Sequence, residues 1–442
     1  MKKFLTIALA FLSVTLLAAC GNGNGNDLDD ELDFEDVEEG VKRVTVWFHV
    51  SEERGEGRAY RRRIDAFNDY YDGEYFATAN YIPRGGGASG YEEKVIAAHT
   101  TDNLPDVITL DGPNTSAYSI ANIIQPIDDY LTSEDRSDFL SSVIEQGTYD
   151  GRIYSLAQME STVGMYYNID LFNECGIEPA TMDDPWTWEV LRDKAERLDG
   201  CLPDGVHPLD LGFRDQTEWL TYALTPFLWT NGGRLVSPNG LNADGYFNSM
   251  ENVEALEFLQ DLYEDDLIFD QHATRPFHNG LIAMSLGGPW VSQELETEYP
   301  NMNWGVMPYP KQDEDAPLYS PTGSWALGVT NNAEHPEAAA EFVRWMTNTE
   351  STIMIHEETG MLPARHSAFD QLDHYNDENS PHYVLRRQLS ETGRSRPATP
   401  SYPTISGSFR YVIEALTAGM DMRDVLDSRI AEIERDLSRF RD

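Results

Sequence analysis

Short apolar runs alternate with helical periodicity where the ordered body of this chain begins, and this pattern decides the fold class. Residues 43–48 read RVTVWF, a β-branched and aromatic run typical of a buried strand. Apolar residues then recur at helical spacing from Ala59 to Tyr71. Residues 91–100 predict a second helix, and residues 106–110 predict a second short strand. Strands that alternate with helices predict an α/β architecture.

Later parts of the chain are mostly helical in pattern. Thr187, in the Trp186-Thr187-Trp188 turn, is suited to cap a helix because its hydroxyl can accept a bond from a free backbone N–H. In the helix after the first strand, Arg61, Arg62 and Arg63 lie between the apolar positions and are expected on its solvated face. Further helices are predicted over residues 252–263, 336–347, 410–418 and 425–440.

The first twenty residues predict export. Lys2 and Lys3 precede an apolar stretch, residues 4–19, that is a few residues short of the roughly 20 needed to span a bilayer. The stretch ends in Leu17-Ala18-Ala19-Cys20, which resembles the lipobox of bacterial lipoproteins. We therefore expect a signal peptide over residues 1–19 and a lipid on Cys20. The alternative is an ordinary signal peptide with an incidental cysteine.

Acidic residues dominate the charge. Asp and Glu number 76 against 32 for Lys and Arg, and the formal net charge is −44. That field makes nucleic acid or an anionic membrane surface a poor partner, so we expect membrane contact through the lipid anchor alone. Residues 20–41 combine a Gly/Asn run with an acidic run and predict a flexible spacer.

The remaining cysteines and the catalytic motifs favour binding over catalysis. Cys175 and Cys201 form either a disulfide or two buried thiols, and neither has neighbours at zinc-site spacing. His356-Glu357 begins like a metalloprotease helix but lacks the second His. We expect no catalytic residues, no metal and no cofactor.

Aromatic residues stand at Gly- and Pro-containing turns. Trp229, Trp290 and Trp325 are examples. An aromatic face at such a turn can cover the C–H face of a sugar ring, while nearby carboxylates accept bonds from its hydroxyls. The alternative for each Trp is packing inside the core.

Several short motifs, in order, carry a family resemblance. From about residue 43 to 440 the chain resembles bacterial extracellular solute-binding proteins of the sugar-uptake class, relatives of maltose-binding protein. The matching segments are Leu104-Pro105-Asp106-Val107, Gly151-Arg152-Ile153-Tyr154, Tyr167-Asn168-Ile169-Asp170-Leu171-Phe172 with Gly176-Ile177, Trp186-Thr187-Trp188, Asn231-Gly232-Gly233, Phe277-His278-Asn279-Gly280 with Ala283-Met284 and Gly288-Pro289-Trp290, Trp304-Gly305-Val306, His335-Pro336-Glu337-Ala338-Ala339, and Gly360-Met361-Leu362-Pro363.

This resemblance implies a two-lobed periplasmic-binding-protein-like fold of type II, with hinge-linked lobes and a central ligand cleft. The expected first lobe comprises residues 42–158 and 308–352. The expected second lobe comprises residues 159–307 and 353–442. Closure of such lobes around a ligand is a recognised conformational switch.

The resemblance also implies ligand-binding residues. Trp290 matches the Trp of the family's Gly-Pro-Trp turn, a sugar-stacking platform. Asp111 matches a cleft carboxylate, and Glu160 is a looser match just after the first hinge crossing. Trp325 and His49 lie at strand-to-loop edges that line the cleft in relatives. Cys175 stands where the family has Ala, and Cys201 has no family counterpart.

The expected function is that of a monomeric lipoprotein on the extracytoplasmic face, which delivers a carbohydrate to the permease of an ABC importer. One alternative keeps the fold but binds a glycerol phosphodiester or a polyamine. An anionic solute would need convergent Arg side chains in the cleft, whereas the surface is strongly negative. The other alternative is a lipid-anchored glycosidase, which turnover of an oligosaccharide would reveal.

Overall fold

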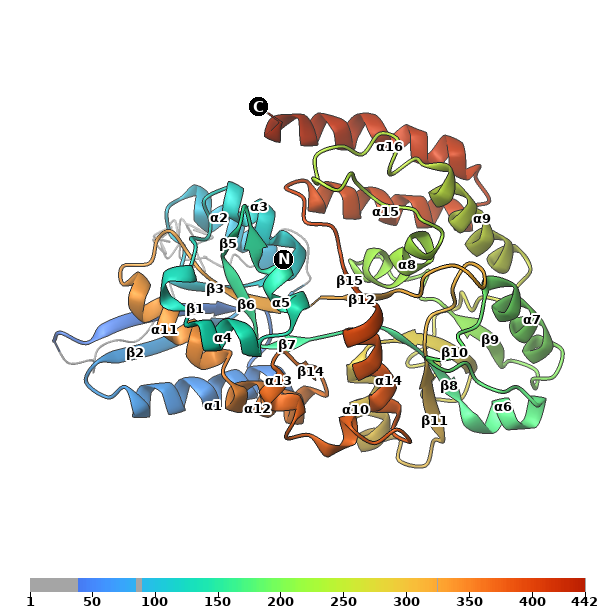
Figure 1. Cartoon of the computed structure of the whole chain (residues 1–442), viewed down its shortest axis with the longest axis horizontal. Coiled ribbons are helices and arrows are strands. Elements are labelled where there is room, and N and C mark those ends of the chain that lie inside the picture. Colours follow the sequence, from blue (N-terminus) through green and yellow to red (C-terminus); the bar gives the residue numbers. More distant parts are fainter. Residues whose placement is uncertain (1–38, 85–89, 324, 442) are drawn as a thin grey trace, which may run out of the picture.

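Two α/β lobes lie side by side in the computed structural model, which describes residues 39–84, 90–323 and 325–441 (Figure 1). The predicted signal peptide, Cys20 and nearly all of the predicted spacer lie outside the described residues. Each lobe has its own sheet and its own buried cluster of apolar side chains.

The first lobe is built on a five-stranded sheet in the order β2-β1-β3-β13-β6. Strand β1 pairs in parallel with β2 and β3, whereas β13 is antiparallel to both β3 and β6. Val44, Val46 and Phe48 of β1 are fully buried, as expected for its apolar run. The strands are β1 (Lys42–Phe48), β2 (Tyr75–Tyr81), β3 (Val107–Asp111), β6 (Ser155–Ala157) and β13 (Trp325–Val329). The helices are α1 (Gly55–Tyr70), α2 (Tyr91–Thr100), α3 (Thr115–Ile120), α4 (Ser133–Asp138), α5 (Ser141–Gln146), α11 (Pro336–Met346) and α12 (Thr349–Thr359).

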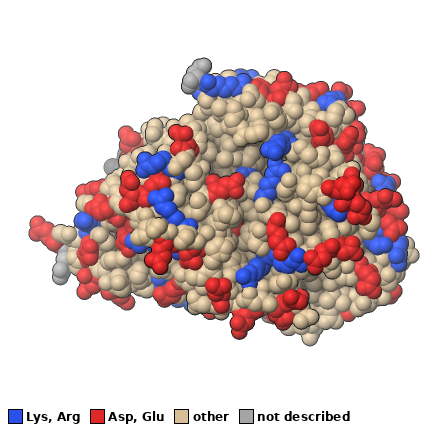
Figure 2. Space-filling model, viewed as in Figure 1, with Lys and Arg blue, Asp and Glu red and all other residues tan. Residues whose placement is uncertain are grey.

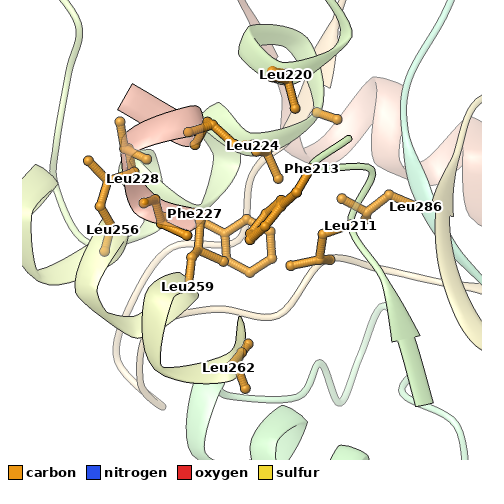
Figure 3. Close-up of a cluster of buried hydrophobic side chains, with 14 of the residues drawn as sticks. Leu211, Phe213, Leu220, Leu224, Phe227, Leu228, Leu256, Leu259, Leu262 and Leu286 are labelled. Carbon is orange, nitrogen blue, oxygen red and sulfur yellow. The ribbon is translucent and has the colours of Figure 1, made fainter. Parts of the chain in front are cut away.

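The second lobe has a four-stranded sheet in the order β11-β8-β10-β9. Leu and Phe side chains from α8, α9 and the strand ends fill its core (Figure 3). Nearly every residue of α8 is buried, which agrees with a helix that is apolar on all sides. The strands are β8 (Gly164–Asn168), β9 (His207–Asp210), β10 (Ile282–Gly287) and β11 (Trp304–Met307). The helices are α6 (Ile169–Cys175), α7 (Trp188–Asp199), α8 (Trp219–Thr230), α9 (Met250–Glu264), α10 (Pro289–Glu298), α14 (Pro381–Arg387), α15 (Tyr402–Thr417) and α16 (Met422–Leu437). Helix α13 (His366–Phe369) lies beside α12, and its Ser367 bonds to Asp138 of α4.

Short strands mark where the chain passes between the lobes. Strand β7 (Met159–Glu160) follows β6 and pairs with β14 (Leu362–Pro363). Strand β12 (Ser320–Thr322) leads into β13 and pairs in parallel with β15 (Gly393–Ser395). A small hairpin, β4 (Thr148–Tyr149) and β5 (Arg152–Ile153), precedes the first crossing.

The packing of two segments favours lobe boundaries that differ from the expected ones. The expected boundary at 352/353 falls inside α12, whose Ile355 is buried in the core of the first lobe. The expected boundary at 307/308 precedes Tyr309 and Leu318, which both pack in the core of the second lobe. We therefore propose that the second crossing lies at β12 and that the third follows α12.

Helix prediction succeeded where the apolar spacing was regular. Helix α2 has the predicted bounds, and the Thr187 hydroxyl accepts a bond from the Val190 N–H (3.2 Å) at the start of α7. Arg63 is different: it is 1 % exposed, whereas Arg61 and Arg62 are exposed as expected. Its guanidinium pairs with Glu350 (2.9 Å) and lies over the Trp345 ring (4.5 Å), so a buried cation is stabilised by partners on α11 and α12.

No helix in the described ranges is long and apolar enough to cross a membrane. The described body therefore supplies no membrane-spanning helix of its own.

A disulfide joins Cys175, at the end of α6, to Cys201, just after α7, with 5.8 Å between the Cα atoms. The sequence left open whether these cysteines form a disulfide or remain two buried thiols, and the structure contains the disulfide. It ties together two helices at the edge of the second lobe, and it closes a loop with a sequence separation of 26.

Reduction is expected to lower the free energy of unfolding by about 3 kcal/mol, because the open loop gains conformational entropy in the unfolded state. Urea denaturation with and without reductant measures this loss. In the matched control Cys175→Ser/Cys201→Ser, reductant should change nothing. Equal stability of the oxidised and reduced chain would contradict a stabilising role for the bridge.

Candidate functional site

A cavity of about 360 Å³ lies between the lobes. This volume is within the range of small-molecule sites. The first lobe contributes the start of α3 and the end of α5. The opposite wall is formed by the end of α8, the loop that follows it, and β15 with the residues after it. The lining residues are Gly112, Pro113, Ser116, Glu145, Gln146, Trp229, Arg234, Leu235, Val236, Ser237, Pro238, Gly393, Arg394, Ser395, Arg396, Pro397 and Ala398.

Arg396 joins the two walls of this cavity. Its guanidinium donates to Asp111 of the first lobe (2.7 and 3.0 Å) and to Glu218 of the second (2.8 Å). The side chain is only 4 % exposed, and it lies over the Tyr222 ring (4.8 Å). Burial opposes its charge, but Asp111, Tyr402 and Glu218 outweigh burial and raise the pKa of Arg396 well above its usual value. The cation therefore stays charged and links the lobes.

Two polar atoms of the lining residues have no hydrogen-bond partner in the described structure. They are Gln146 Oε1, an acceptor, and Arg396 Nε, a donor. A buried polar group without a partner costs about 1–3 kcal/mol.

Asp111 and Glu160 lie behind the cavity wall and not in it. Asp111 ends β3 and pairs with Arg396. Glu160, on β7, is fully buried and accepts bonds from the Ser142 hydroxyl (2.7 Å), Gln146 Nε2 (3.2 Å) and the Ser161 N–H (3.0 Å). Burial raises the pKa of Glu160 to about 7 despite these donors. Both carboxylates thus position residues that line the cavity, Arg396 and Gln146.

The rings of His49 and Trp325 stack on each other in the first lobe. Their rings are parallel and 3.5 Å apart, and the Arg84 guanidinium lies 4.8 Å from the centroid of the Trp325 ring. His49 is buried, and its Nδ1 is 3.2 Å from the Thr109 hydroxyl. Burial and the charge of Arg84 lower the pKa of His49. Neither ring is among the residues that line the cavity.

Trp290 lies at the start of α10 and is partly buried against the core of the second lobe. Its indole meets the Trp219 ring edge to face, with 5.9 Å between the centroids. It also covers Gly288, where a Cβ atom would come within 2.2 Å of the indole. Trp290 is not among the residues that line the cavity.

The residues that do line the cavity carried weak signals in the sequence. Trp229 was one of the aromatic residues at a Gly-containing turn. Arg234 and Arg396 belong to loops and Arg394 to the short strand β15, none with a recognisable motif, and only the fold brings them together. The part of the chain that the structure describes has no group of three or more His, Cys, Asp or Glu placed to hold a metal ion.

Acid side chains spread over both halves of the molecule, while a few basic side chains gather near the middle of the face in Figure 2. The local charge at the junction of the lobes therefore differs from the average of the chain.

Glu160 makes stability depend on pH. Its pKa is higher in the folded state than the ordinary 4.5, so the folded state binds more protons between about pH 4.5 and 7. The free energy of unfolding should fall as pH rises through this window, by at most ~1.4 kcal/mol per pH unit for one carboxyl group. Denaturation of Glu160→Gln from pH 4.5 to 8 should show a flatter profile. The control Glu93→Gln, on the exposed face of α2, should keep the parent slope, and an unchanged slope in Glu160→Gln would contradict the assignment.

Comparison with known proteins identifies the family. A family model described as "Bacterial extracellular solute-binding protein" matches residues 63–381 of this chain. The sn-glycerol-3-phosphate-binding periplasmic protein UgpB of Shigella dysenteriae is 27% identical over 351 residues, which cover 75% of this chain and 76% of that protein. UgpB of Escherichia coli K12 is 26% identical over 351 residues, which again cover 75% of this chain and 76% of that protein.

Solved structures agree on the fold. The sugar-binding protein MalE of Xanthomonas citri has a TM-score of 0.76 at 19% identity and covers 90% of this chain and 98% of its own. The cyclic alpha-maltosyl-1,6-maltose binding protein of Arthrobacter globiformis has a TM-score of 0.74 at 24% identity, covering 90% and 100%. The predicted two-lobed fold is confirmed, and this chain belongs to the bacterial extracellular solute-binding proteins.

Proposed function

We propose that this chain is the receptor of an ABC-type importer, that it captures a carbohydrate in the cavity between its lobes, and that it delivers this solute to the permease. The observation that carries the proposal is the interlobe cavity itself, which is lined by residues of both lobes. A solute that bonds to both walls favours the closed arrangement over an open one.

The lining suits a sugar. Pro238 and the largely buried Trp229 border the cavity with apolar atoms, and Ser116, Ser237 and Ser395 border it with hydroxyls. A hydroxylated ring needs this combination of an apolar face and several hydrogen-bonding groups. Structural relatives bind cyclic alpha-maltosyl-1,6-maltose, cycloalternan and mannobiose according to their descriptions, which supports an oligosaccharide.

Binding requires no covalent step. Glu145 is the one carboxylate among the described lining residues. Asp111 and Glu218 both pair with the lining residue Arg396, so their role is to hold the guanidinium. We propose that the solute leaves the protein chemically unchanged and that the receptor acts as a monomer.

A second candidate is a glycerol phosphate or one of its diesters. The curated relatives UgpB are described as sn-glycerol-3-phosphate-binding proteins, which favours it. A glycerol phosphate is smaller than an oligosaccharide and carries a negative charge. A screen that contains both kinds of compound shows which of them binds.

A thermal-shift screen over mono- and oligosaccharides, with sn-glycerol 3-phosphate in the same plate, should reveal a ligand that raises the melting temperature. At 100-fold over Kd the ligand adds about 2.7 kcal/mol of stability. X-ray scattering with that ligand should give a smaller radius of gyration than without it, and the recovered ligand should be intact. A saturating ligand that leaves the radius unchanged would contradict closure, and its hydrolysis would favour the glycosidase.

Anchoring rests on the Leu17-Ala18-Ala19-Cys20 segment. We propose that Cys20 carries the lipid and that residues 21–41 connect it to the folded body. Cys20→Ser should move the protein from the washed membrane fraction to the soluble extracytoplasmic fraction, with an unchanged melting temperature. The control Cys201→Ser should stay in the membrane fraction. Retention of Cys20→Ser in washed membranes would contradict the anchor.

A further inference from the structure

The interlobe cavity carries more positive charge than this acidic chain would lead one to expect. Three of the residues that line it are Arg234, Arg394 and Arg396, and Glu145 is the single carboxylate among the described lining residues. Arg396 is neutralised by Asp111 and Glu218. Within the described ranges, no carboxylate oxygen lies within 4.0 Å of a guanidinium nitrogen of Arg234 or Arg394. A chain with 76 acidic residues thus leaves two cations in its cavity without a direct carboxylate partner.

Arg394 is held in place although it has no ion-pair partner. Its guanidinium lies 4.9 Å from the centre of the Trp229 ring and 5.0 Å from that of Tyr319. Its backbone belongs to β15, where it pairs with Pro321 of β12 at the crossing between the lobes. Two aromatic contacts and a strand therefore fix the direction of a side chain that is only half-exposed.

Arg234 adds a second positive charge to the same wall. It follows the Gly232-Gly233 turn after α8 and is exposed. Burial and the neighbouring charge of Arg234 lower the pKa of Arg394. Two like charges that share a half-buried wall repel each other, and an anion between them would remove this cost. A planar guanidinium matches the oxygens of a carboxylate or a phosphate, to which it can donate two parallel bonds.

Glu145 does not remove the need for an anion. It lies on α5 of the opposite lobe, and its charge raises the pKa of Arg394, although less than burial and Arg234 lower it. It forms no ion pair with Arg394 within 4.0 Å. The positive charge of the second lobe's wall thus remains available to a ligand.

We propose that the solute is a hydroxylated molecule with an anionic group, a carboxylate or a phosphate ester, and that Arg394 and Arg234 bind this group. The inference rests on the proposed function, since it takes the interlobe cavity as the solute site. Trp229 then has two roles: it orients the Arg394 guanidinium and borders the space for the sugar ring. The convergent arginines expected for an anionic solute are present, in spite of the negative charge of the chain as a whole.

The test uses matched pairs of probes on the full chain in a thermal-shift assay, followed by calorimetry. Uronate oligosaccharides are compared with their methyl esters, and maltose 1-phosphate and sn-glycerol 3-phosphate with maltose and glycerol. In at least one pair the acidic member should bind at least tenfold more tightly than its neutral counterpart, and its affinity should fall with added salt. The pair that responds distinguishes a carboxylate from a phosphate ligand.

Variants assign the effect to residues. Arg394→Gln and Arg234→Gln should each weaken binding of the acidic probe at least tenfold, while Arg394→Lys should retain part of the affinity. Arg435→Gln, an exposed position of α16 away from the cavity, is the control with the same change of charge and should leave the affinity unchanged. Arg234→Gln keeps the test valid if Arg394→Gln fails to fold, because Arg234 is exposed.

The outcomes separate the two proposals. A neutral saccharide that binds as tightly as every acidic probe and is unaffected by Arg394→Gln and Arg234→Gln would overturn the anion site and leave the sugar receptor intact. If no probe of either kind changes the melting temperature, the proposed function fails and this inference fails with it. Equal losses in Arg435→Gln would mean a general effect of net charge and would also overturn the site.

Discussion

A buried guanidinium at the junction of the lobes is the interaction on which the rest of this structure depends. Arg396 donates to Asp111 on one lobe and to Glu218 on the other, at 2.7–3.0 Å. A cation taken out of water is costly unless it is paired, and here each lobe supplies one carboxylate. The pairing therefore links the lobes at the point where the cavity lies. It also means that a change at either carboxylate affects the geometry of the whole site.

Much of the fold could be predicted because it depends on local patterns. The apolar run of β1 and the regular spacing of α2 and α7 are properties of neighbouring residues, and the structure has these elements where they were expected. Boundaries between the lobes were harder to predict. Helix α12 follows α11 closely and packs on the first lobe, and nothing in its own sequence indicates which of the two cores it joins. Arg63 is a similar case, because its burial depends on Trp345 and Glu350, far along the chain.

The site was predicted only in part, for the same reason. The resemblance pointed to Asp111 and Glu160, which support the residues of the cavity wall from behind. Trp290, Trp325 and His49 pack against other rings of their own lobes. The lining itself comes from three stretches, near residues 112–146, 229–238 and 393–398, that meet only after both lobes have formed. The positive charge of the cavity wall results from the packing of these three stretches together, and no single segment predicts it.

The position of β13 has a consequence for how the chain folds. This strand lies between β3 and β6 in the first sheet, although it follows the entire sheet of the second lobe in sequence. During synthesis the first lobe has a gap in the middle of its sheet until residue 329 has left the ribosome, so β6 has no neighbour to pair with. Such non-local pairing slows folding, because the entropy of closing a long loop is lost before the stabilising contacts between the strands form. The sheet of the first lobe therefore cannot be completed while the C-terminal part of the chain is still being made.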